Sequence, residues 1–415
     1  MKNIWRPFTQ EKTTPPSIKI VKGEGAYLIA ENGDRYLDMV SSWWTNLHGH
    51  ANPEIAEAIG VQAKTLEQAI FTRFTHDPAE KLVEDLKRVV PPSLSRYFFS
   101  DNGSTSVEVA LKMAYQYFKN IGVKNRDIFL SLDGGYHGDT FGAMSVAGAN
   151  SIYHFAFRDL FFKTITVDVP EYCEGVESID EKEDEIVRKL DKTLDEVGDR
   201  ICAFIAEPLL QGSVGMRVYR PQFLERIVNK VRERGILVIF DEVMTGFYRT
   251  GKMFAMDRTK VTPDVICISK TLTGGFLPLA LTVVTEQIYD AFLSDDKSKT
   301  FYHGHSYAGN PIACAAARKS LEILLRKETL DRIAAISNYH KNRKIKNVVK
   351  RRNLGVITAF DAESEKKANS IVERARREGI FLRPLGKTIY ILPPYCVGDE
   401  DLERTYAAIE KATNL

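Results

Sequence analysis

The sequence predicts an α/β protein with a large, doubly wound and mostly parallel sheet, and with a smaller α+β domain. Between about residues 50 and 325, predicted strands alternate with predicted helices, which is the pattern of a parallel sheet. Two short apolar runs in this region, Gly235–Asp241 and Asp264–Lys270, are typical of buried parallel strands. After a helix predicted near Asn310–Arg326, short strands and helices mix, which indicates the smaller domain.

The remaining predicted elements divide the chain into these two domains. Apolar runs at 25–30 and 35–40 flank Asn32-Gly33, and Asn-Gly between such runs is a strong hairpin signal. We therefore expect residues 1–49 to join the small domain through this hairpin. Residues 50–310 should form the large domain, and residues 311–415 should add a linking helix and the rest of the small domain. Further strands are predicted at 96–100, 128–132, 164–167, 201–206, 356–360, 380–383 and 388–392, and further helices at 222–234, 365–378 and 400–412.

Length and composition restrict the functional class. A chain of 415 residues has room for two or three cores at roughly 150 residues per domain. The 57 basic and 55 acidic residues nearly cancel, which gives no electrostatic reason to expect nucleic acid or a membrane surface. No apolar run approaches the roughly 20 residues that span a bilayer, and five cysteines without a Cys-x-x-Cys pair predict reduced thiols. We therefore expect a cytoplasmic protein that binds neither nucleic acid nor membranes.

Two ionisable side chains end the two apolar runs and predict a shared site. Asp241 and Lys270 would emerge at the carboxyl ends of parallel strands, where open α/β sheets bind their ligands. An amine and a carboxylate in one crevice suit pyridoxal phosphate (PLP), because the amine binds the aldehyde and the carboxylate keeps the ring nitrogen protonated. A buried ion pair joining two strands is the alternative explanation.

PLP also requires a phosphate site, and the segment at residues 100–105 offers one. It follows a predicted strand and opens a predicted helix, whose positive end attracts a phosphate. Gly103 permits close approach of the backbone, while Ser104 and Thr105 offer hydroxyl and amide groups. A simple helix N-cap would explain the same residues equally well.

The pyridine ring requires a flat neighbour, for which Tyr136 is the candidate. Glycines surround this tyrosine in the segment Asp133–Asp139, which follows a predicted strand. Such a loop can present an aromatic ring to a flat ligand. A turn with a half-buried tyrosine is the alternative.

Two His-Gly-His pairs, His48–His50 and His303–His305, raise the question of a metal site. Neither pair has a third carboxylate or thiolate ligand at a recognisable spacing, and each lies in a turn-like context. We therefore predict no metal site.

Two charge-rich segments, Glu177–Asp191 and Lys341–Arg352, could suggest binding patches. In the basic segment, Ile345, Val348 and Val349 recur at helical spacing. We therefore predict a solvated helix face there rather than a binding surface.

Further motifs resemble a known family. Asp241–Val243 with Lys270 about thirty residues later, Glu207-Pro208, Gly246–Gly251 and Gly309–Pro311 resemble the class III, fold-type I aminotransferases, which use PLP. The resemblance covers nearly the whole chain. It implies the fold of fold-type I PLP-dependent transferases and a homodimer with a shared active site.

A second set of motifs is similar to one subgroup of this class. Trp5–Thr9, Ser41–Trp44, Gly135–Ser145 and Arg383–Tyr390 resemble the enzymes that convert 8-amino-7-oxononanoate to 7,8-diaminononanoate in biotin synthesis. The resemblance implies this acceptor, with S-adenosylmethionine as the amino donor. Lysine as the donor remains an alternative, as does another class III ω-aminotransferase acting on ornithine, 4-aminobutyrate or a diamine.

The resemblance also implies roles for particular residues. Lys270 would bind PLP and move the proton, Asp241 would pair with the ring nitrogen, and Val243 and Tyr136 would pack on opposite faces of the ring. The other implied cofactor-binding residues are Gly103, Ser104, Thr105 and Glu207, with His305 and Ser306 supplied by the second chain. The implied substrate-binding residues are Phe8, Trp43, Trp44, Tyr136, Asp139, Arg249, Gly304, Arg383 and Tyr390.

Trp43 and Arg383 make physical sense for a long aliphatic acid, which needs an apolar wall ending in a guanidinium. A core tryptophan and a surface arginine are the alternatives. Phe8 stands where the subgroup commonly has a tyrosine, which leaves the amino donor open, and His305-Ser306 replaces a Pro-Thr pair. Rival functions of other classes are a ligand-binding protein without catalysis and a Schiff-base aldolase, and the aldolase would need no phosphate site.

Overall fold

The computed structural model describes residues 3–148 and 152–414, and its largest element is a seven-stranded sheet with the order β4-β12-β11-β10-β7-β5-β6. Strand β12 pairs antiparallel with β4 and β11, whereas β11, β10, β7, β5 and β6 pair in parallel. The predicted α/β fold with a mostly parallel sheet is confirmed. The strands are β4 (Leu94–Ser100), β5 (Ile128–Leu132), β6 (Thr164–Val167), β7 (Ile201–Ala206), β10 (Leu237–Asp241), β11 (Val265–Ile268) and β12 (Ala280–Thr285).

Helices cover this sheet and explain its apolar sequence. All residues of β5, β7, β10 and β11 are buried, and strands covered on both faces are apolar throughout. Helix α4 (Gly103–Asn120) packs against β7, β10, β11 and β12, and α7 (Pro221–Glu233) packs against β10. The acidic segment at 177–191 lies mostly in α6 (Ile179–Val197), which packs against α7.

The two ends of the chain meet in a second sheet, with the order β1-β2-β3-β15. Strand β15, from the C-terminal part, pairs in parallel with β3, with Ile380 beside Leu37. A third sheet, β13-β14-β17-β16, is formed entirely by C-terminal residues. These strands are β1 (Ile20–Glu24), β2 (Tyr27–Ala30), β3 (Arg35–Asp38), β13 (Val349–Leu354), β14 (Ile357–Asp361), β15 (Ile380–Phe381), β16 (Pro384–Leu385) and β17 (Thr388–Ile391).

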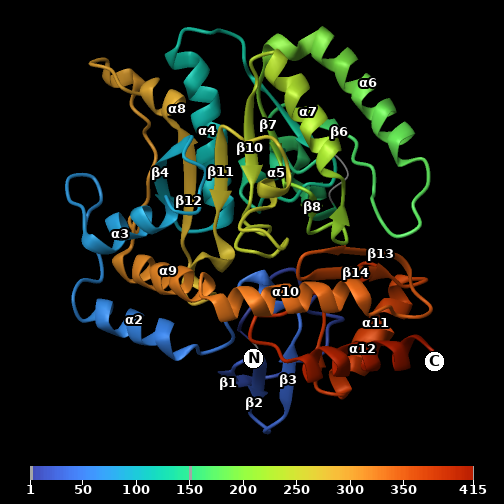
Figure 1. Ribbon diagram of the computed structural model, residues 1–415. Helices are drawn as coiled ribbons and strands as arrows, with labels where there is room; N and C mark the ends of the chain where they lie inside the picture. The colour runs from blue at the N-terminus through green and yellow to red at the C-terminus, as the bar shows by residue number, and fades with distance from the viewer. Residues whose placement is uncertain (1–2, 149–151, 415) are drawn as a thin grey trace.

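Figure 1 shows α9 and α10 lying between the seven-stranded sheet and the strands β1–β3, with both chain ends on the side away from that sheet. The predicted hairpin around Asn32-Gly33 is present as the antiparallel pair β2–β3. The division of the chain at residues 49 and 310 stays a prediction.

The remaining elements are α1 (Ser41–Trp44), α2 (Pro53–Ala63), α3 (Asp77–Leu86), α5 (Phe141–Ser145), α8 (Glu286–Asp290), α9 (Pro311–Leu324), α10 (Lys327–Asn342), α11 (Glu365–Arg377), α12 (Asp399–Thr413), β8 (Leu210–Gln211), β9 (Arg217–Val218), and 3-10 helices at Ile152–Leu160, Gly198–Arg200, Ala255–Arg258, Lys270–Thr273 and Lys297–Lys299.

The helix predicted over the basic segment 341–352 is wrong. Helix α10 ends at Asn342, and strand β13 begins at Val349. Val348 and Val349 are separated from Ile345 by a turn at Asn347, which has a positive φ of 58°. Three apolar residues are too few to distinguish a helical period from a strand period, because an edge strand with one buried face can space its apolar residues in a similar way.

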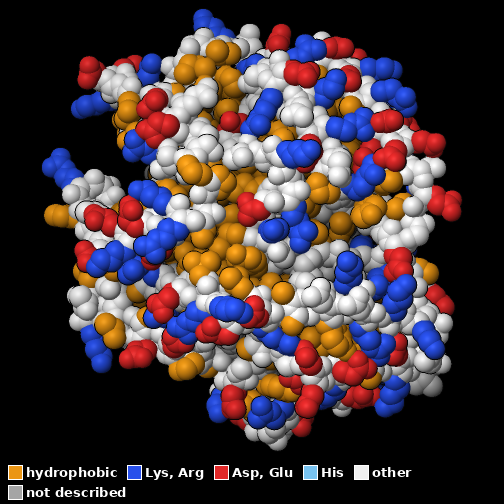
Figure 2. Space-filling model, viewed as in Figure 1, with side chains coloured by type: hydrophobic (Ala, Val, Ile, Leu, Met, Phe, Trp, Pro, Cys, Tyr) orange, Lys and Arg blue, Asp and Glu red, His pale blue; other side chains and the backbone are white. Residues whose placement is uncertain are grey.

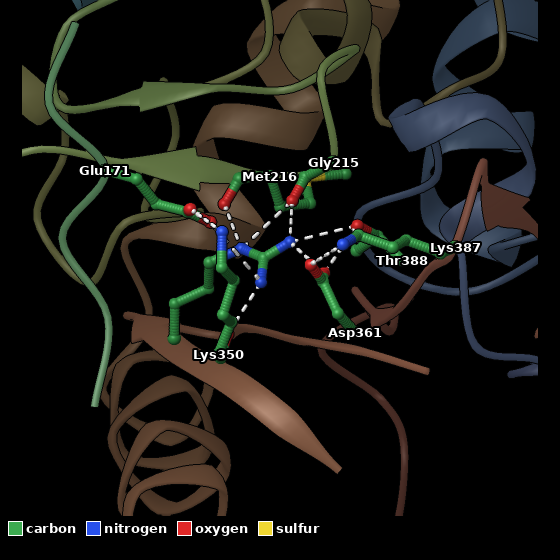
Figure 3. Close-up of polar contacts among 8 residues, drawn as sticks. Glu171, Gly215, Met216, Lys350, Asp361, Lys387 and Thr388 are labelled. Carbon is green, nitrogen blue, oxygen red and sulfur yellow. Dashed lines mark hydrogen bonds and ion pairs between the residues drawn. The ribbon is translucent and has the colours of Figure 1, made fainter. Parts of the chain in front are cut away.

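Arg352, on β13, joins the C-terminal sheet to the turn between β8 and β9. Its buried guanidinium donates through Nε to the carbonyl oxygens of Gly215 and Met216, each at 3.0 Å. Through Nη2 it donates to Asp361 Oδ1 and Thr388 Oγ1, also at 3.0 Å each. Figure 3 shows these four partners converging from separate strands and from the turn. The arginine therefore ties two parts of the fold together through buried polar contacts.

We expect Arg352→Met to lower the free energy of unfolding by about 3–5 kcal/mol, because it leaves the buried Asp361 without its main cation. Lys387, whose Nζ is 3.7 Å from Asp361 Oδ2, would compensate only in part. Urea denaturation followed by circular dichroism measures the change. The matched control is Arg377→Met on the surface, where losing the pair with Glu373 should cost about 1 kcal/mol or less. Equal stability of the two variants would contradict the role given to Arg352.

The surface carries mixed charge. Figure 2 shows Lys and Arg side chains interspersed with Asp and Glu over the visible face, which agrees with a net charge of only +2. Among the helices of the described residues, none has the length and apolar character needed to cross a bilayer.

Candidate active site

A cavity of about 480 Å³ lies where β10 and β11 end. Asp241 is the last residue of β10, and Lys270 follows the end of β11 by two residues. The two strands are parallel neighbours, with Asp241 beside Cys267, so both side chains reach the same edge of the sheet and line the cavity. The cavity is lined by Thr45, Asp101, Asn102, Gly103, Ser104, Tyr136, His137, Gly138, Glu207, Asp241, Val243, Met244, Ser269, Lys270, Gly275, Phe276, Leu277, Pro278 and Leu279.

Asp241 is buried and held in a fixed orientation. Its Oδ2 atom accepts a hydrogen bond from His137 Nδ1 at 2.7 Å, and its Oδ1 atom accepts one from the backbone N–H of Val243 at 3.0 Å. His137 is also buried, and its Nε2 atom has no hydrogen-bond partner within the described part of the chain. A carboxylate fixed in this way can present its charge in one direction, as a pyridinium nitrogen requires.

Sequence reasoning missed His137, although the residue directly follows the predicted ring-stacking Tyr136. Gly135 supports its placement, since a Cβ atom there would lie only 2.9 Å from His137 Nε2. An imidazole beside the predicted stacking residue, within a glycine-rich loop, was the available signal. Its partner Asp241 lies 104 positions away in the sequence, and a contact of that range follows only from the fold.

Lys270 has the environment of a reactive amine. Burial lowers the pKa of its ammonium group, against the opposing charges of Asp241, Glu207 and Asp139. Its Nζ atom lies 4.9 Å from the ring centroid of Trp44. The backbone of Lys270 has a φ of 35°, a conformation that side chains rarely adopt and that is concentrated at functional sites. A lowered pKa increases the share of neutral amine, which is the form that attacks an aldehyde.

The predicted phosphate segment forms the N-terminus of α4. Asn102 caps this helix of 18 residues, and Thr105 completes a capping box. The Thr105 hydroxyl group donates to Asp101 Oδ1 at 2.7 Å and is absent from the cavity lining, whereas Gly103 and Ser104 do line the cavity. The N-cap explanation therefore applies to Asn102 and Thr105. Gly103 and Ser104, which lie between them, leave the positive helix end open toward the cavity.

Two glycines of the cavity lining allow close packing around it. A Cβ atom at Gly103 would lie 2.7 Å from Val243 Cγ1, and one at Gly138 would lie 2.0 Å from Ser104 Oγ. Gly138 also has a φ of +125°, which other residues rarely adopt. A side chain at Gly103 would clash with Val243, and one at Gly138 would separate the loop that carries Tyr136 from Ser104 at the helix end.

Tyr136 and Glu207 also line the cavity, in the segments that follow β5 and β7. The Tyr136 hydroxyl donates to Asp139 Oδ2 at 2.7 Å, and its backbone N–H donates to Glu207 Oε1 at 3.0 Å. Glu207 accepts a second hydrogen bond from the backbone N–H of Gly212 at 3.0 Å. Burial raises the pKa of the Glu207 carboxyl group to about 7, and the positive charge of His137 opposes this shift.

Three of the predicted substrate residues form a cluster outside the cavity lining. The Arg383 guanidinium lies 4.1 Å from the centroid of the Trp43 ring, and the Phe8 ring lies 5.5 Å from the same ring. Trp43 is 40% exposed and Arg383 is half-buried. No carboxylate of the described residues forms an ion pair with Arg383. The cluster thus combines an apolar surface with a cation that contacts Tyr390 and has no carboxylate partner among the described residues.

Arg249 and Tyr390, predicted to bind substrate, are buried in the fold. Arg249 donates to the carbonyl oxygens of Pro393 at 3.0 Å and Asn46 at 2.7 Å, which fixes its position between two chain segments. The Tyr390 hydroxyl accepts a hydrogen bond from Trp44 Nε1 at 2.9 Å, and burial raises the pKa of Tyr390 to about 12. Neither residue lines the cavity.

Gly304, predicted to bind substrate, and His305 and Ser306, predicted to act at the site of a second chain, also lie outside the cavity lining. Gly304 and Ser306 are exposed, and His305 Nε2 lies 3.9 Å from Oδ1 of the cavity residue Asp101. The contribution of this loop to a partner's site stays a prediction.

Sequence reasoning also missed one wall of the cavity, formed by residues 275–279. The signal was the pair Gly274-Gly275, which follows the predicted amine closely. Both glycines have a positive φ, and a Cβ atom at Gly275 would lie 3.1 Å from the backbone of Asn46. The glycines let the chain turn tightly between Lys270 and strand β12.

The parts of the cavity match those of one cofactor. It offers an amine at a strand end, a buried carboxylate for a ring nitrogen, Tyr136 and Val243 for the faces of a flat ring, and a helix N-terminus for a phosphate. Gly103 and Gly138 let the chain segments that line the cavity pack closely against one another. The fold and the site thus define a PLP-dependent enzyme of fold type I.

The chain belongs to the class III aminotransferases, since the family model for aminotransferase class-III matches residues 8–413. It is 47% identical to an adenosylmethionine-8-amino-7-oxononanoate aminotransferase of Synechococcus elongatus, over 98% of this chain and 97% of that protein. A crystal structure of the enzyme of that name from Methanocaldococcus jannaschii has a TM-score of 0.90 at 34% identity, covering 100% and 97% of the two chains. An amine transaminase from an uncultivated Pseudomonas species, solved in its PLP-bound form, has a TM-score of 0.92 at 30% identity, covering 100% and 99%.

Proposed function

We propose that this protein transfers an amino group to the carbonyl carbon of 8-amino-7-oxononanoate, which yields 7,8-diaminononanoate for biotin synthesis. The observation that carries the proposal is the half-buried Arg383, which lies over Trp43 and has no ion-pair partner among the described residues. The names of relatives that match 96% to 100% of this chain support the same acceptor.

The residues of the cavity supply the steps that a transaminase needs. PLP, when bound, supplies an electron sink that lets a proton leave the carbon bearing the amine. Lys270 can hold the cofactor through its amine, and then move that proton between two carbons when a substrate amine displaces it. Asp241, fixed by His137, keeps the ring nitrogen protonated. Two such half-reactions in sequence exchange an amine for a carbonyl, first on the donor and then, in reverse, on the acceptor.

The acceptor has a long aliphatic chain that ends in a carboxylate, and the Trp43 cluster matches both features. The indole and phenyl rings of Trp43 and Phe8 provide an apolar wall. The Arg383 guanidinium can bind the carboxylate through paired hydrogen bonds. Ornithine and 4-aminobutyrate would leave this wall largely uncovered, because their chains are shorter.

A kinetic comparison tests the acceptor. The PLP-loaded enzyme should form 7,8-diaminononanoate, and Arg383→Met should raise KM for 8-amino-7-oxononanoate by about 10- to 100-fold, the loss expected for a hydrogen-bonded charge pair. Arg377→Met, at an exposed position on α11, is the control and should leave KM unchanged. If the enzyme uses ornithine, 4-aminobutyrate or a diamine but not 8-amino-7-oxononanoate, the proposal is wrong.

For the amino donor we propose S-adenosylmethionine, which the names of the relatives support. Phe8 is 52% exposed and packs against Trp43, so it contributes a ring but no hydroxyl group to the substrate side. The same assay with S-adenosylmethionine or lysine as the only donor decides between the two. Turnover with lysine alone would revise the donor and leave the acceptor unaffected.

We further propose a cytoplasmic homodimer in which the loop with His305 and Ser306 completes the partner's phosphate site. The exposed rings of Tyr302 and Tyr307 in this loop offer apolar surface for a second chain. All five cysteines are free thiols, as expected in a reducing compartment. Light scattering on the purified protein gives the oligomeric state, and a monomer that is fully active would contradict the shared site.

A further inference from the structure

The two tryptophans near the site lie in the short element α1, whose backbone is not helical at Ser42 and Trp43 and forms an irregular turn. Ser41, Ser42 and Trp44 have positive φ values of 51°, 60° and 65°, although none of them is glycine. Bulky residues in this region are conformational outliers, and such backbone persists only where its surroundings impose it. The turn therefore needs a support outside its own sequence.

That support is Asp38, which has no solvent exposure. Its Oδ1 atom accepts a hydrogen bond from the backbone N–H of Val40 at 3.2 Å. Its Oδ2 atom accepts from the backbone N–H of Ser42 at 2.6 Å and from the Ser42 hydroxyl at 3.2 Å. One buried carboxylate thus binds the turn at two backbone positions.

His50 holds the carboxylate from the other side. Its Nε2 atom lies 3.0 Å from Asp38 Oδ2, and its Nδ1 atom lies 3.0 Å from Asn46 Nδ2. Asn46 Oδ1 in turn accepts the backbone N–H of Gly49 at 2.8 Å. The imidazole therefore connects Asp38, before the turn, to Asn46, after it, so that the two tryptophans lie between two linked residues.

The turn positions one tryptophan ring beside the Lys270 amine and the other beside the Arg383 guanidinium. Trp44 carries its ring to 4.9 Å from the Lys270 amine, while its Nε1 atom is bound to Tyr390. Trp43 carries its ring to 4.1 Å from the guanidinium of Arg383. Because the two rings are on adjacent residues, a change in the turn moves the wall at the reacting amine and the wall at the carboxylate anchor together.

We propose that Asp38, held by His50, is a positioning residue that fixes Trp43 and Trp44 between the reacting amine and the substrate anchor, and thereby sets the length of acceptor that the site accepts. The kinetic part of this inference rests on the proposed function. The structural part, that Asp38 fixes the two indoles, does not depend on it. Asp38 touches neither the cavity nor Arg383, so its effect must pass through the turn.

Tryptophan fluorescence reports directly on this turn. The chain has three tryptophans, and Trp5 is 87% exposed, so Trp5→Phe leaves emission from Trp43 and Trp44 only. In this background, Asp38→Asn in the PLP-loaded protein should shift the emission to longer wavelength and make it more accessible to acrylamide, because the buried Trp44 loosens. The same variant should lower kcat/KM for 8-amino-7-oxononanoate about 10- to 100-fold, as expected when a positioning contact is displaced.

Asp361→Asn is the matched control. Asp361 is also buried and also accepts from a basic side chain, but its partners are Arg352 and Thr388 rather than residues of the turn. It should leave the emission and kcat/KM unchanged even if stability falls. If Asp38→Asn does not fold, the pair His50→Gln and His50→Leu replaces it: the amide of glutamine can still donate to Asp38, so Gln should keep more of the emission and of kcat/KM than Leu.

Unchanged emission and acrylamide access in Asp38→Asn would overturn the inference, as would equal behaviour of the two His50 variants. Changed emission in Asp38→Asn but not in Asp361→Asn supports it. An enzyme that shows this fluorescence change and has no activity on 8-amino-7-oxononanoate would refute the proposed function and leave the structural part standing. The two failures are therefore separate.

Discussion

Replacing Lys270 with alanine should abolish amino transfer. The loss of an acid–base group alone lowers rates by about 10²–10⁴-fold, and here the covalent anchor for PLP is lost as well. The purified variant should also lack the visible absorbance of lysine-bound cofactor. Stopped assays with high enzyme concentration and a visible spectrum measure both effects.

Two controls separate chemistry from folding in this experiment. Lys260→Ala removes an exposed lysine ten positions earlier and should keep full activity. Lys270→Arg keeps a positive charge in the cavity but cannot form the covalent bond, and should be as inactive as the alanine variant. Substantial turnover in either Lys270 variant would contradict the assignment of this amine.

The second large effect is expected for Asp241→Asn, which should still bind PLP but lose about 10²–10³-fold in kcat. Removing one preorganised electrostatic partner of a developing charge has a cost of this size. The geometry should persist, because the amide oxygen of asparagine can still accept from His137 Nδ1 or from the Val243 N–H. The ring nitrogen would lose its ionic partner, and with it the proton that makes the ring an electron sink.

The control for this variant is Asp264→Asn. Asp264 stands just before β11 at the opposite edge of the sheet, where its Oδ2 atom accepts the Val238 N–H at 2.8 Å. The Asp264→Asn variant should change kcat little. Asp264 is largely buried, so its replacement should lower stability by an amount comparable to that of Asp241→Asn. An Asp241→Asn enzyme with an undiminished rate would show that the carboxylate does not act on the ring.

The main sheet and the strand ends could be predicted because their signals are local. Gly235–Asp241 and Asp264–Lys270 each combine a short apolar run with one ionisable end, and burial on both faces explains that composition. The helix start proposed to bind the phosphate was also identifiable as a helix start, since a glycine after a capping residue is a local pattern. Its dual nature became visible only in the structure, where Asn102 and Thr105 cap the helix and Gly103 and Ser104 face the cavity.

What could not be predicted depends on distant contacts. The antiparallel β12 was missed because an apolar strand reads the same in either direction. The pairing of β15 with β3 joins residues more than 340 positions apart. The hydrogen bonds of Arg249 to two backbone carbonyl oxygens could not be read from its motif, and its substrate contact stays a prediction. The hydrogen-bond partners of a charged side chain must therefore be known before a role can be assigned to it from a motif.

The proposed active site depends most on one covalent bond, between Lys270 and the cofactor. Borohydride reduction of the PLP-loaded protein, followed by digestion and mass spectrometry, locates the lysine that carries a pyridoxyl group. We predict a single modified peptide, with the adduct on Lys270, and its absence from the Lys270→Arg variant. An adduct on another lysine, or none at all, would contradict the active site described for the ends of β10 and β11.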